Sequence, residues 1–171
     1  MTAETTTIAT TPDALTAEIE ILAPPDRVFA ALTEQPQLFL WWGREPSVEL
    51  TSFEMDARVG GHWQFTCIPN SKRPADAIAA QLEQNAAQEF IAHGEVLEID
   101  PPRLLIWSWT ANWHRDPLLA TVVRWELTPT RSGTLVRVTH SGLANDAAAH
   151  KDYNSGWVGV LRLLNGFLSE D

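Results

Sequence analysis

One stretch decides the fold: ATVVRWELTPTRSGTLVRVTHS, residues 120–141. Apolar residues occupy every second position on both sides of a short turn at 131–133, and Trp125 is the largest of them. Residues two apart in a strand point to the same face of a sheet. A connection this short joins antiparallel neighbours. The stretch therefore predicts two paired strands, 120–128 and 134–141, that turn one apolar face toward the interior.

The same alternation continues toward the N-terminus. It predicts further strands over 15–21, 48–53, 59–67, 94–99 and 104–110. Between them stand prolines, glycines and aspartates, which favour turns. Together with the first two strands, these segments predict a single antiparallel sheet of about seven strands.

Eight tryptophans lie in this chain of 171 residues, and most of them follow the strand alternation. Trp63 shares a face with Phe65, and Trp107 shares one with Trp109. Several strands thus point wide rings toward one interior. A chain of this size needs few such rings to fill a core, so the surplus favours the walls of an apolar cavity. Plain core packing is the alternative.

Helices are predicted at two places. Pro24 and Pro25 end the first strand and open a short helix, because proline fits the first helical turn, and a second short helix begins at Pro36. Residues 147–168 predict a long amphipathic helix with Trp157 on its apolar stripe. A sheet with one apolar face must curve around something, and this helix supplies the matching surface. The predicted fold is therefore α+β, a curved antiparallel sheet wrapped around a long C-terminal helix.

Two segments depart from this pattern. Residues 1–14 begin with a stretch that lacks apolar periodicity, so we expect a disordered tail before a single domain over 15–171. Residues 69–92 break the strand rhythm and become rich in Ala and Gln, which predicts a helical insertion. The apolar stripe of this helix would consist of Ile78, Leu82, Ala86 and Phe90. It could be a lid over the cavity, a contact in a homodimer, or plain packing against the sheet.

The composition excludes several classes of function. Twelve Lys and Arg against 22 Asp and Glu give a net charge of −10, which would repel nucleic acid and anionic membrane surfaces. The chain has no apolar run of the roughly 18 residues that a membrane span needs, and its start lacks the features of a signal peptide. The single cysteine, Cys67, forms no internal disulfide, which suits a cytoplasmic protein. The histidine and cysteine spacings match no common metal site, and no phosphate-binding loop is present, so we expect neither a metal nor a cofactor.

His140 is a polar residue on the inward face of the last predicted strand. It shares parity with Val136 and Val138, whereas Arg137 and Thr139 take the other face. It could contact a ligand in the cavity. Alternatively, it is a core histidine that a backbone carbonyl satisfies.

Seven motifs, in order along the chain, carry a resemblance to a known family. They are Ala23–Phe29, Trp41-Trp42, Arg58–Gly61, Gly94–Leu104, Trp109, Thr139–Leu143 and Gly156-Trp157. This set is similar to the START-related helix-grip superfamily (SRPBCC). Within it, the set resembles the branch named for the C-terminal domain of the activator of the ninety-kilodalton heat-shock protein ATPase. The resemblance covers residues 15–168 and implies a curved antiparallel sheet that grips the C-terminal helix over a hydrophobic cavity.

We therefore expect the chain to bind a small hydrophobic molecule, as a carrier or a sensor rather than as an enzyme. The expected cavity lining is Trp63, Phe65, Trp107, Trp109 and Trp125 on the sheet, Trp157 and Leu161 on the helix, and His140 as the polar contact. Three tryptophans near element ends would rim the mouth or form a self-association patch: Trp41, Trp42 and Trp113. The family name suggests an alternative, a co-chaperone-like module that binds a chaperone through its surface. Catalytic members of the superfamily suggest a third, a cyclase or hydrolase that uses the same cavity.

Overall fold

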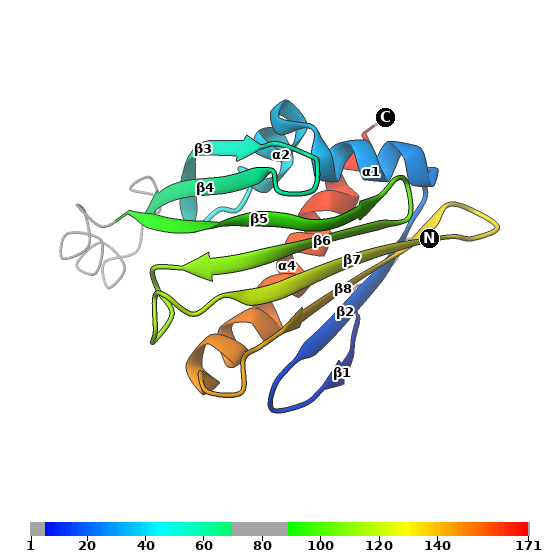
Figure 1. The fold of residues 1–171 in the computed structure, drawn as a ribbon. Coiled ribbons are helices and arrows are strands. Elements are labelled where there is room, and N and C mark those ends of the chain that lie inside the picture. The colour runs from blue at the N-terminus through cyan, green and yellow to red at the C-terminus, as the bar shows by residue number, and fades with distance from the viewer. Residues whose placement is uncertain (1–5, 70–88, 171) are drawn as a thin grey trace.

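The computed structural model describes residues 6–69 and 89–170, which form a curved sheet packed on helices (Figure 1). The strands are β1 (Thr6–Thr10), β2 (Leu15–Ile21), β3 (Val48–Met55), β4 (His62–Pro69), β5 (Phe90–Asp100), β6 (Leu104–Ala111), β7 (Thr121–Pro129) and β8 (Thr134–Ser141). The helices are α1 (Pro25–Thr33), α2 (Gln35–Trp42) and α4 (Ala147–Leu168). The predicted α+β class is confirmed.

A single antiparallel sheet contains all the described strands, in the order β1-β2-β8-β7-β6-β5-β4-β3. The predicted hairpin lies inside it, where β7 and β8 pair with Trp125 opposite Val138. α4 crosses one face of the sheet, whereas α1 and α2 lie at one end of the molecule, with α2 in contact with β3 (Figure 1). The sheet and α4 thus form the helix-grip arrangement that the sequence predicts.

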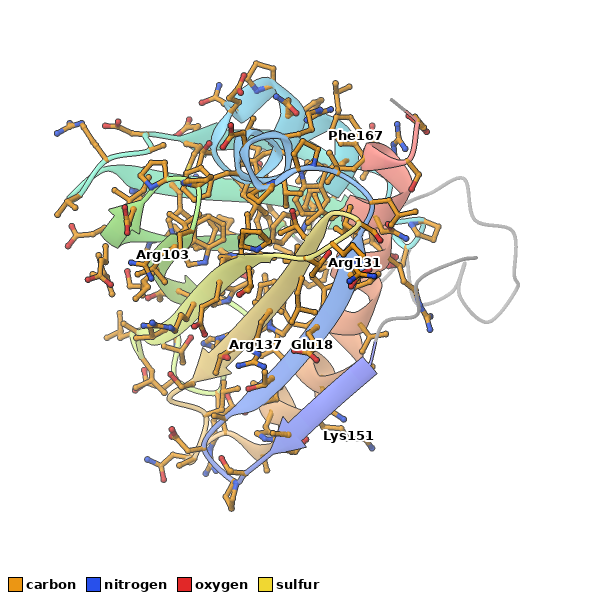
Figure 2. All side chains as sticks on the ribbon, turned by 90° about the vertical axis from the view of Figure 1, so that its right-hand side faces the viewer. Glu18, Arg103, Arg131, Arg137, Lys151 and Phe167 are labelled. Atoms are coloured by element: carbon orange, nitrogen blue, oxygen red, sulfur yellow. The ribbon has the colours of Figure 1, made fainter. Side chains whose placement is uncertain are left out.

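The two faces of the sheet differ in polarity. Along β7, alternate residues from Thr121 to Leu127 are buried and belong to the interior face. The outer face carries charged side chains, among them Arg137, which pairs with Glu18 on the neighbouring strand β2 at 3.2 Å between Nε and Oε2 (Figure 2). Partly exposed ion pairs contribute little to stability. Most of the stability of the sheet therefore comes from its interior face, which holds the aromatic rings.

α4 fits the interior face because its apolar residues follow helical spacing. The large buried residues of this helix recur three or four positions apart: Tyr153, Trp157, Leu161, Leu164 and Leu168. Asp146 caps the helix by accepting a hydrogen bond from the Ala149 backbone N–H at 3.0 Å. Burial of one Trp removes about 150–250 Å² from water, an upper limit of about 4–6 kcal/mol.

Within the described ranges, no helix is long and apolar enough to span a membrane.

Two glycines occupy positions that other residues fit poorly, Gly60 because of its backbone conformation and Gly94 because of close approach to a neighbouring strand. Gly60 has a φ of +81°, and its N–H donates to the Val96 carbonyl oxygen at 2.8 Å, which fixes the bend that leads into β4. Gly94 on β5 lies against β6, where a Cβ would overlap the carbonyl oxygen of Ser108. The bend predicted at Gly60-Gly61 is present, and glycine at position 94 lets β5 and β6 come together.

The N-terminus differs from expectation. The prediction of a disordered tail over residues 1–14 is wrong for Thr6–Thr10, which forms β1 and pairs with β2. Threonine is β-branched and favours strands, and the free edge of β2 supplies hydrogen-bonding partners. The described sheet therefore has eight strands instead of seven.

The predicted helical insertion over 69–92 falls mainly on residues 70–88, which lie outside the described residues. At its two edges, Pro69 ends β4 and Phe90–Ala92 begins β5. Phe90 therefore belongs to a strand and not to the predicted helical stripe. The lid, dimer-contact and packing interpretations of the stripe stay predictions.

Candidate functional site

A hollow of about 520 Å³ opens between α2, strands β3 to β5 and α4. We call it the groove, and its lining residues are Trp42, Glu45, Ser47, Val48, Leu50, Phe65, Cys67, Phe90, Trp113 and Asp152. A smaller hollow of about 150 Å³, the inner hollow, is lined by Trp42, Phe65, Trp109, Trp113, Tyr153, Gly156, Trp157 and Val160. The two share three aromatic residues, so they adjoin along one aromatic wall.

Strand and helix periodicity together explain how the walls are positioned. Phe65 and Cys67 are two apart on β4 and therefore face the groove together. On α4, Asp152, Gly156 and Val160 are spaced four apart, so they form a stripe along one side of the helix. This stripe runs beside the buried one and borders both hollows.

The aromatic rings of the groove form a continuous wall. Ring centroids are 5.5 Å apart for Trp42 and Phe65, 6.3 Å for Phe65 and Trp113, and 6.2 Å for Trp113 and Phe90. These separations lie in the range of favourable aromatic pairs. Trp42 and Phe65 are buried, whereas Trp113 and Phe90 are only half-buried. The wall therefore extends from the interior to the surface.

A hydrogen-bonded network borders the inner hollow. The Trp109 indole N–H donates to the Tyr153 hydroxyl oxygen at 2.9 Å, and this oxygen lies 2.7 Å from His114 Nε2. Burial raises the pKa of the Tyr153 phenol and lowers the pKa of His114. At neutral pH the phenol therefore keeps its proton, and it shares a hydrogen bond with an uncharged imidazole. All three polar groups find their partners within the protein.

His140 is fully buried and fully hydrogen-bonded. The Trp157 indole N–H donates to Nδ1 at 3.0 Å, so the ring proton resides on Nε2, which donates to Thr121 Oγ1 at 2.7 Å. The Thr121 hydroxyl donates in turn to the Trp109 carbonyl oxygen at 2.9 Å. Burial lowers the pKa of His140 to about 3, and the other nearby histidines add to the shift. His140 is thus a neutral core histidine whose partners are two side chains, not the backbone carbonyl that we considered.

Three of the eight residues predicted to line a cavity border the two hollows. Phe65 lines both of them, and Trp109 and Trp157 line the inner hollow. The other five border neither and are buried in the core between the sheet and α4: Trp63, Trp107, Trp125, His140 and Leu161. A role for these five in ligand binding stays a prediction.

The three tryptophans expected at the rim have different positions. Trp42 and Trp113 line both hollows. Trp41 is wholly buried, and its indole N–H donates to the Ala31 carbonyl oxygen on α1 at 2.8 Å. Two of the three therefore border the hollows, and a role as the rim of a cavity mouth stays a prediction.

Several lining residues were not predicted as part of a site. They are Glu45, Ser47, Val48, Leu50, Cys67, Asp152, Tyr153, Gly156 and Val160. Cys67 could have been found, because it shares parity with Phe65 on the same strand. Phe90 was predicted as part of a helical stripe that could cover the cavity, whereas it borders the groove from strand β5.

The reactive groups that line the groove belong to Glu45, Ser47, Cys67 and Asp152. Cys67 is its one sulfur nucleophile, and burial, assisted by the charge of Glu89, raises the pKa of the thiol to about 11. A protonated thiol is a poor nucleophile at neutral pH. Among residues 6–69 and 89–170, no group of three or more His, Cys, Asp or Glu is arranged to hold a metal ion. The arrangement is suited to binding an apolar molecule.

Comparison with known proteins gives a family and a fold. The family model described as Activator of Hsp90 ATPase homolog 1-like protein matches residues 22–169. No curated protein matches the sequence significantly.

Solved structures with the same fold come from several bacteria. A protein of Rhodobacter sphaeroides aligns with a TM-score of 0.76 at 20% identity, over 98% of this chain and 99% of that one. A protein of Chromobacterium violaceum aligns with a TM-score of 0.74 at 21% identity, over 94% of this chain and 100% of that one. An AHSA1-like protein from Aeromonas hydrophila aligns with a TM-score of 0.67 at 16% identity, over 92% of each chain. At these identities the similarity shows a common fold and leaves the activity to be argued from the site.

Proposed function

The chain belongs to the family of Activator of Hsp90 ATPase homolog 1-like proteins, and from that premise and its groove we propose that it binds a small apolar molecule, as a carrier or a sensor. The observation that carries the proposal is the aromatic hollow of about 520 Å³ beside α4. Pockets for small molecules typically enclose about 300–1,000 Å³, with apolar walls and a few polar groups. The groove has both properties.

The placement of polar and apolar groups supports an apolar ligand. The polar residues Glu45, Ser47 and Asp152 are exposed or half-buried, whereas the rings behind them are continuous with the core. A ligand in the groove would cover the half-buried rings of Phe90 and Trp113. Each Å² of apolar surface removed from water contributes about 25 cal/mol, so covering two rings favours binding. The inner hollow gives such a ligand room for one ring or a short chain.

Binding can be measured with N-phenyl-1-naphthylamine, a neutral probe whose fluorescence rises in apolar surroundings. The blocking variant is Gly156→Leu, because Gly156 lines the inner hollow and a Cβ added there meets no atom within 4 Å. The leucine fills space that a ligand would use, and leucine favours helix more than glycine does. Probe affinity should fall about tenfold, or about 1.4 kcal/mol, without loss of stability.

The matched control is Gly166→Leu. Gly166 lies on the same helix, is equally open around an added Cβ, and borders neither hollow. It should leave probe affinity unchanged. An equal loss of affinity in both variants, or no probe binding by the native chain at micromolar concentrations, rejects the proposal.

The family name favours a second candidate, stimulation of a chaperone ATPase. Phe39 and Leu40 on α2 are exposed and border two shallow hollows, which supplies apolar surface for a protein partner. Hydrolysis of ATP by purified Hsp90, with and without the chain, tests this candidate. If stimulation occurs, replacing both Phe39 and Leu40 by serine should abolish it, while Gly156→Leu should not.

A further inference from the structure

The groove has a charge character as well as an apolar one. Glu45 follows α2 and Asp152 lies on α4, so two elements each bring a carboxylate to it. The Ser47 backbone N–H and hydroxyl both donate to Glu45 Oε1, at 2.8 and 2.6 Å. Among the described residues, none donates to Glu45 Oε2, and none forms an ion pair with either carboxylate. Both carboxylates can therefore meet a ligand.

No described Lys or Arg lines the groove. Arg44 is next to Glu45 in sequence, but it pairs with both carboxylate oxygens of Glu170, at 2.8 and 2.9 Å, and lies over the Phe167 ring. Other basic side chains belong to different surfaces: Figure 2 labels Arg103, Arg131, Arg137 and Lys151, and none of these lines either hollow.

The histidines near the inner hollow add no positive charge. Burial lowers the pKa of His114, which bonds to Tyr153, and lowers the pKa of His140 to about 3. Both rings are therefore neutral at neutral pH. From the described residues, a ligand in the groove meets aromatic rings and carboxylates, with no opposing cation.

We propose that the groove selects an organic cation, a molecule with an apolar body and an amine or quaternary ammonium group. Aromatic faces attract a cation held within about 6 Å of the ring centroid, and Trp gives the strongest attraction. Trp42 and Trp113 supply such rings, while Glu45 and Asp152 supply the opposite charge. An anionic ligand such as a fatty acid would meet two like charges instead. This assignment rests on the proposed function, because it names the ligand class of the same groove.

The test compares three ligands of one shape that differ in charge. Each competes with bound N-phenyl-1-naphthylamine: (1-naphthylmethyl)trimethylammonium, its neutral isostere 1-neopentylnaphthalene, and the anion 1-naphthylmethanesulfonate. The cation should bind about tenfold more tightly than the neutral isostere, and the anion more weakly than both. If the cation binds no better than its neutral isostere, the inference is overturned. The proposed function still stands in that case, provided that the chain binds the neutral probe.

Two double variants separate the effect of the two groove carboxylates from the effect of net charge. Glu45→Gln with Asp152→Asn should lower the ratio of cation to neutral affinity about fivefold. Glu20→Gln with Glu98→Gln makes the same change in net charge at exposed positions that line neither hollow, and it should keep the ratio. An equal change of the ratio in both double variants, or no change in the first, overturns the assignment to the groove. Failure of the native chain to bind the neutral probe rejects the proposed function as well.

Discussion

The interior face of the sheet has a closed region and an open region, built from similar aromatic residues. In the closed region the rings are almost completely buried: Trp63, Trp107, Trp125 and, on α4, Trp157. In the open region the rings border the groove: Trp42, Phe65, Phe90 and Trp113. Packing distances do not separate the two regions, because the ring centroids of Trp125 and Trp157 are 5.5 Å apart, as are those of Trp42 and Phe65.

The residues that α4 presents to the rings determine which region is closed and which is open. In the closed region, Trp157 packs edge-on against Trp125 with centroids 5.5 Å apart. At the groove and the inner hollow, the neighbouring stripe of the same helix presents Asp152 and Gly156, which fill little space. One helix therefore converts part of an aromatic face into core and leaves another part as a groove.

The indole N–H groups of the closed region are only partly satisfied: Trp63 donates to the Ser108 carbonyl oxygen at 2.9 Å and Trp157 donates to His140 Nδ1 at 3.0 Å. The indole N–H groups of Trp107 and Trp125 find no hydrogen-bond partner among the described residues, and the two rings meet edge to face at 6.2 Å. Beside the inner hollow, Trp109 donates to Tyr153. Apolar packing in the closed region must therefore offset two unmade hydrogen bonds.

The largest expected effect is in the closed region. Trp125→Ala should lower the free energy of unfolding by about 3–5 kcal/mol, because it removes a buried ring and leaves a cavity. Urea denaturation followed by far-ultraviolet circular dichroism measures the loss. A loss below about 1 kcal/mol would mean that the closed region is as loosely packed as the groove.

The second effect depends on pH and concerns the boundary between the regions. The pKa of His140 is about 3 in the fold, below its unfolded value of about 6.5, so its contribution to stability is complete above pH 6.5 and is lost as the pH falls toward 3. Between pH 6.5 and pH 4, this loss should lower the free energy of unfolding by about 3 kcal/mol. His140→Gln cannot titrate, so its unfolding free energy should fall less steeply over that range. Parallel pH profiles would exclude His140 as the source.

Tyr153→Phe should have a smaller effect, about 1–3 kcal/mol. It leaves the Trp109 N–H and His114 Nε2 without their partner while it keeps the ring in place. Urea denaturation at neutral pH measures the loss, with Tyr153→Leu as the comparison that also removes the ring. If Phe is as stable as Tyr at this position, water replaces the hydroxyl, and the inner hollow is wetter than its lining indicates.

The smallest effect on stability is expected in the open region. Trp113→Ala should cost less than about 1 kcal/mol of unfolding free energy, because the ring is half-buried and borders the groove. The same variant should weaken binding of N-phenyl-1-naphthylamine about fivefold. A large loss of stability without a change in affinity would assign Trp113 to the core.

Local periodicity predicted the elements well where backbone geometry alone determines the pattern. The alternation around Trp125 predicted β7 and β8, and helical spacing predicted α4 over 147–168, as observed. β1 was missed because Thr6–Thr10 has no apolar alternation. Its order depends on pairing with β2, which is a property of the whole sheet.

The site was harder to predict, because it depends on which side of α4 meets which strand. Trp125 and Phe65 both point inward, yet only Phe65 borders the groove. The inward direction of His140 followed from parity, whereas its partners, Thr121 on β7 and Trp157 on α4, depend on tertiary packing. His114 lies in a loop without periodicity, so its link to Tyr153 left no trace in the sequence pattern.

α4 follows every described strand in chain order, and this matters during synthesis. Until residues 147–168 have emerged from the ribosome, the tryptophans of the closed region lack the helix that covers them. The nascent chain therefore exposes an apolar indole surface while its strands are being made. Once α4 has been made, Trp157 covers these rings. A chain released before the helix is made would therefore be prone to aggregate.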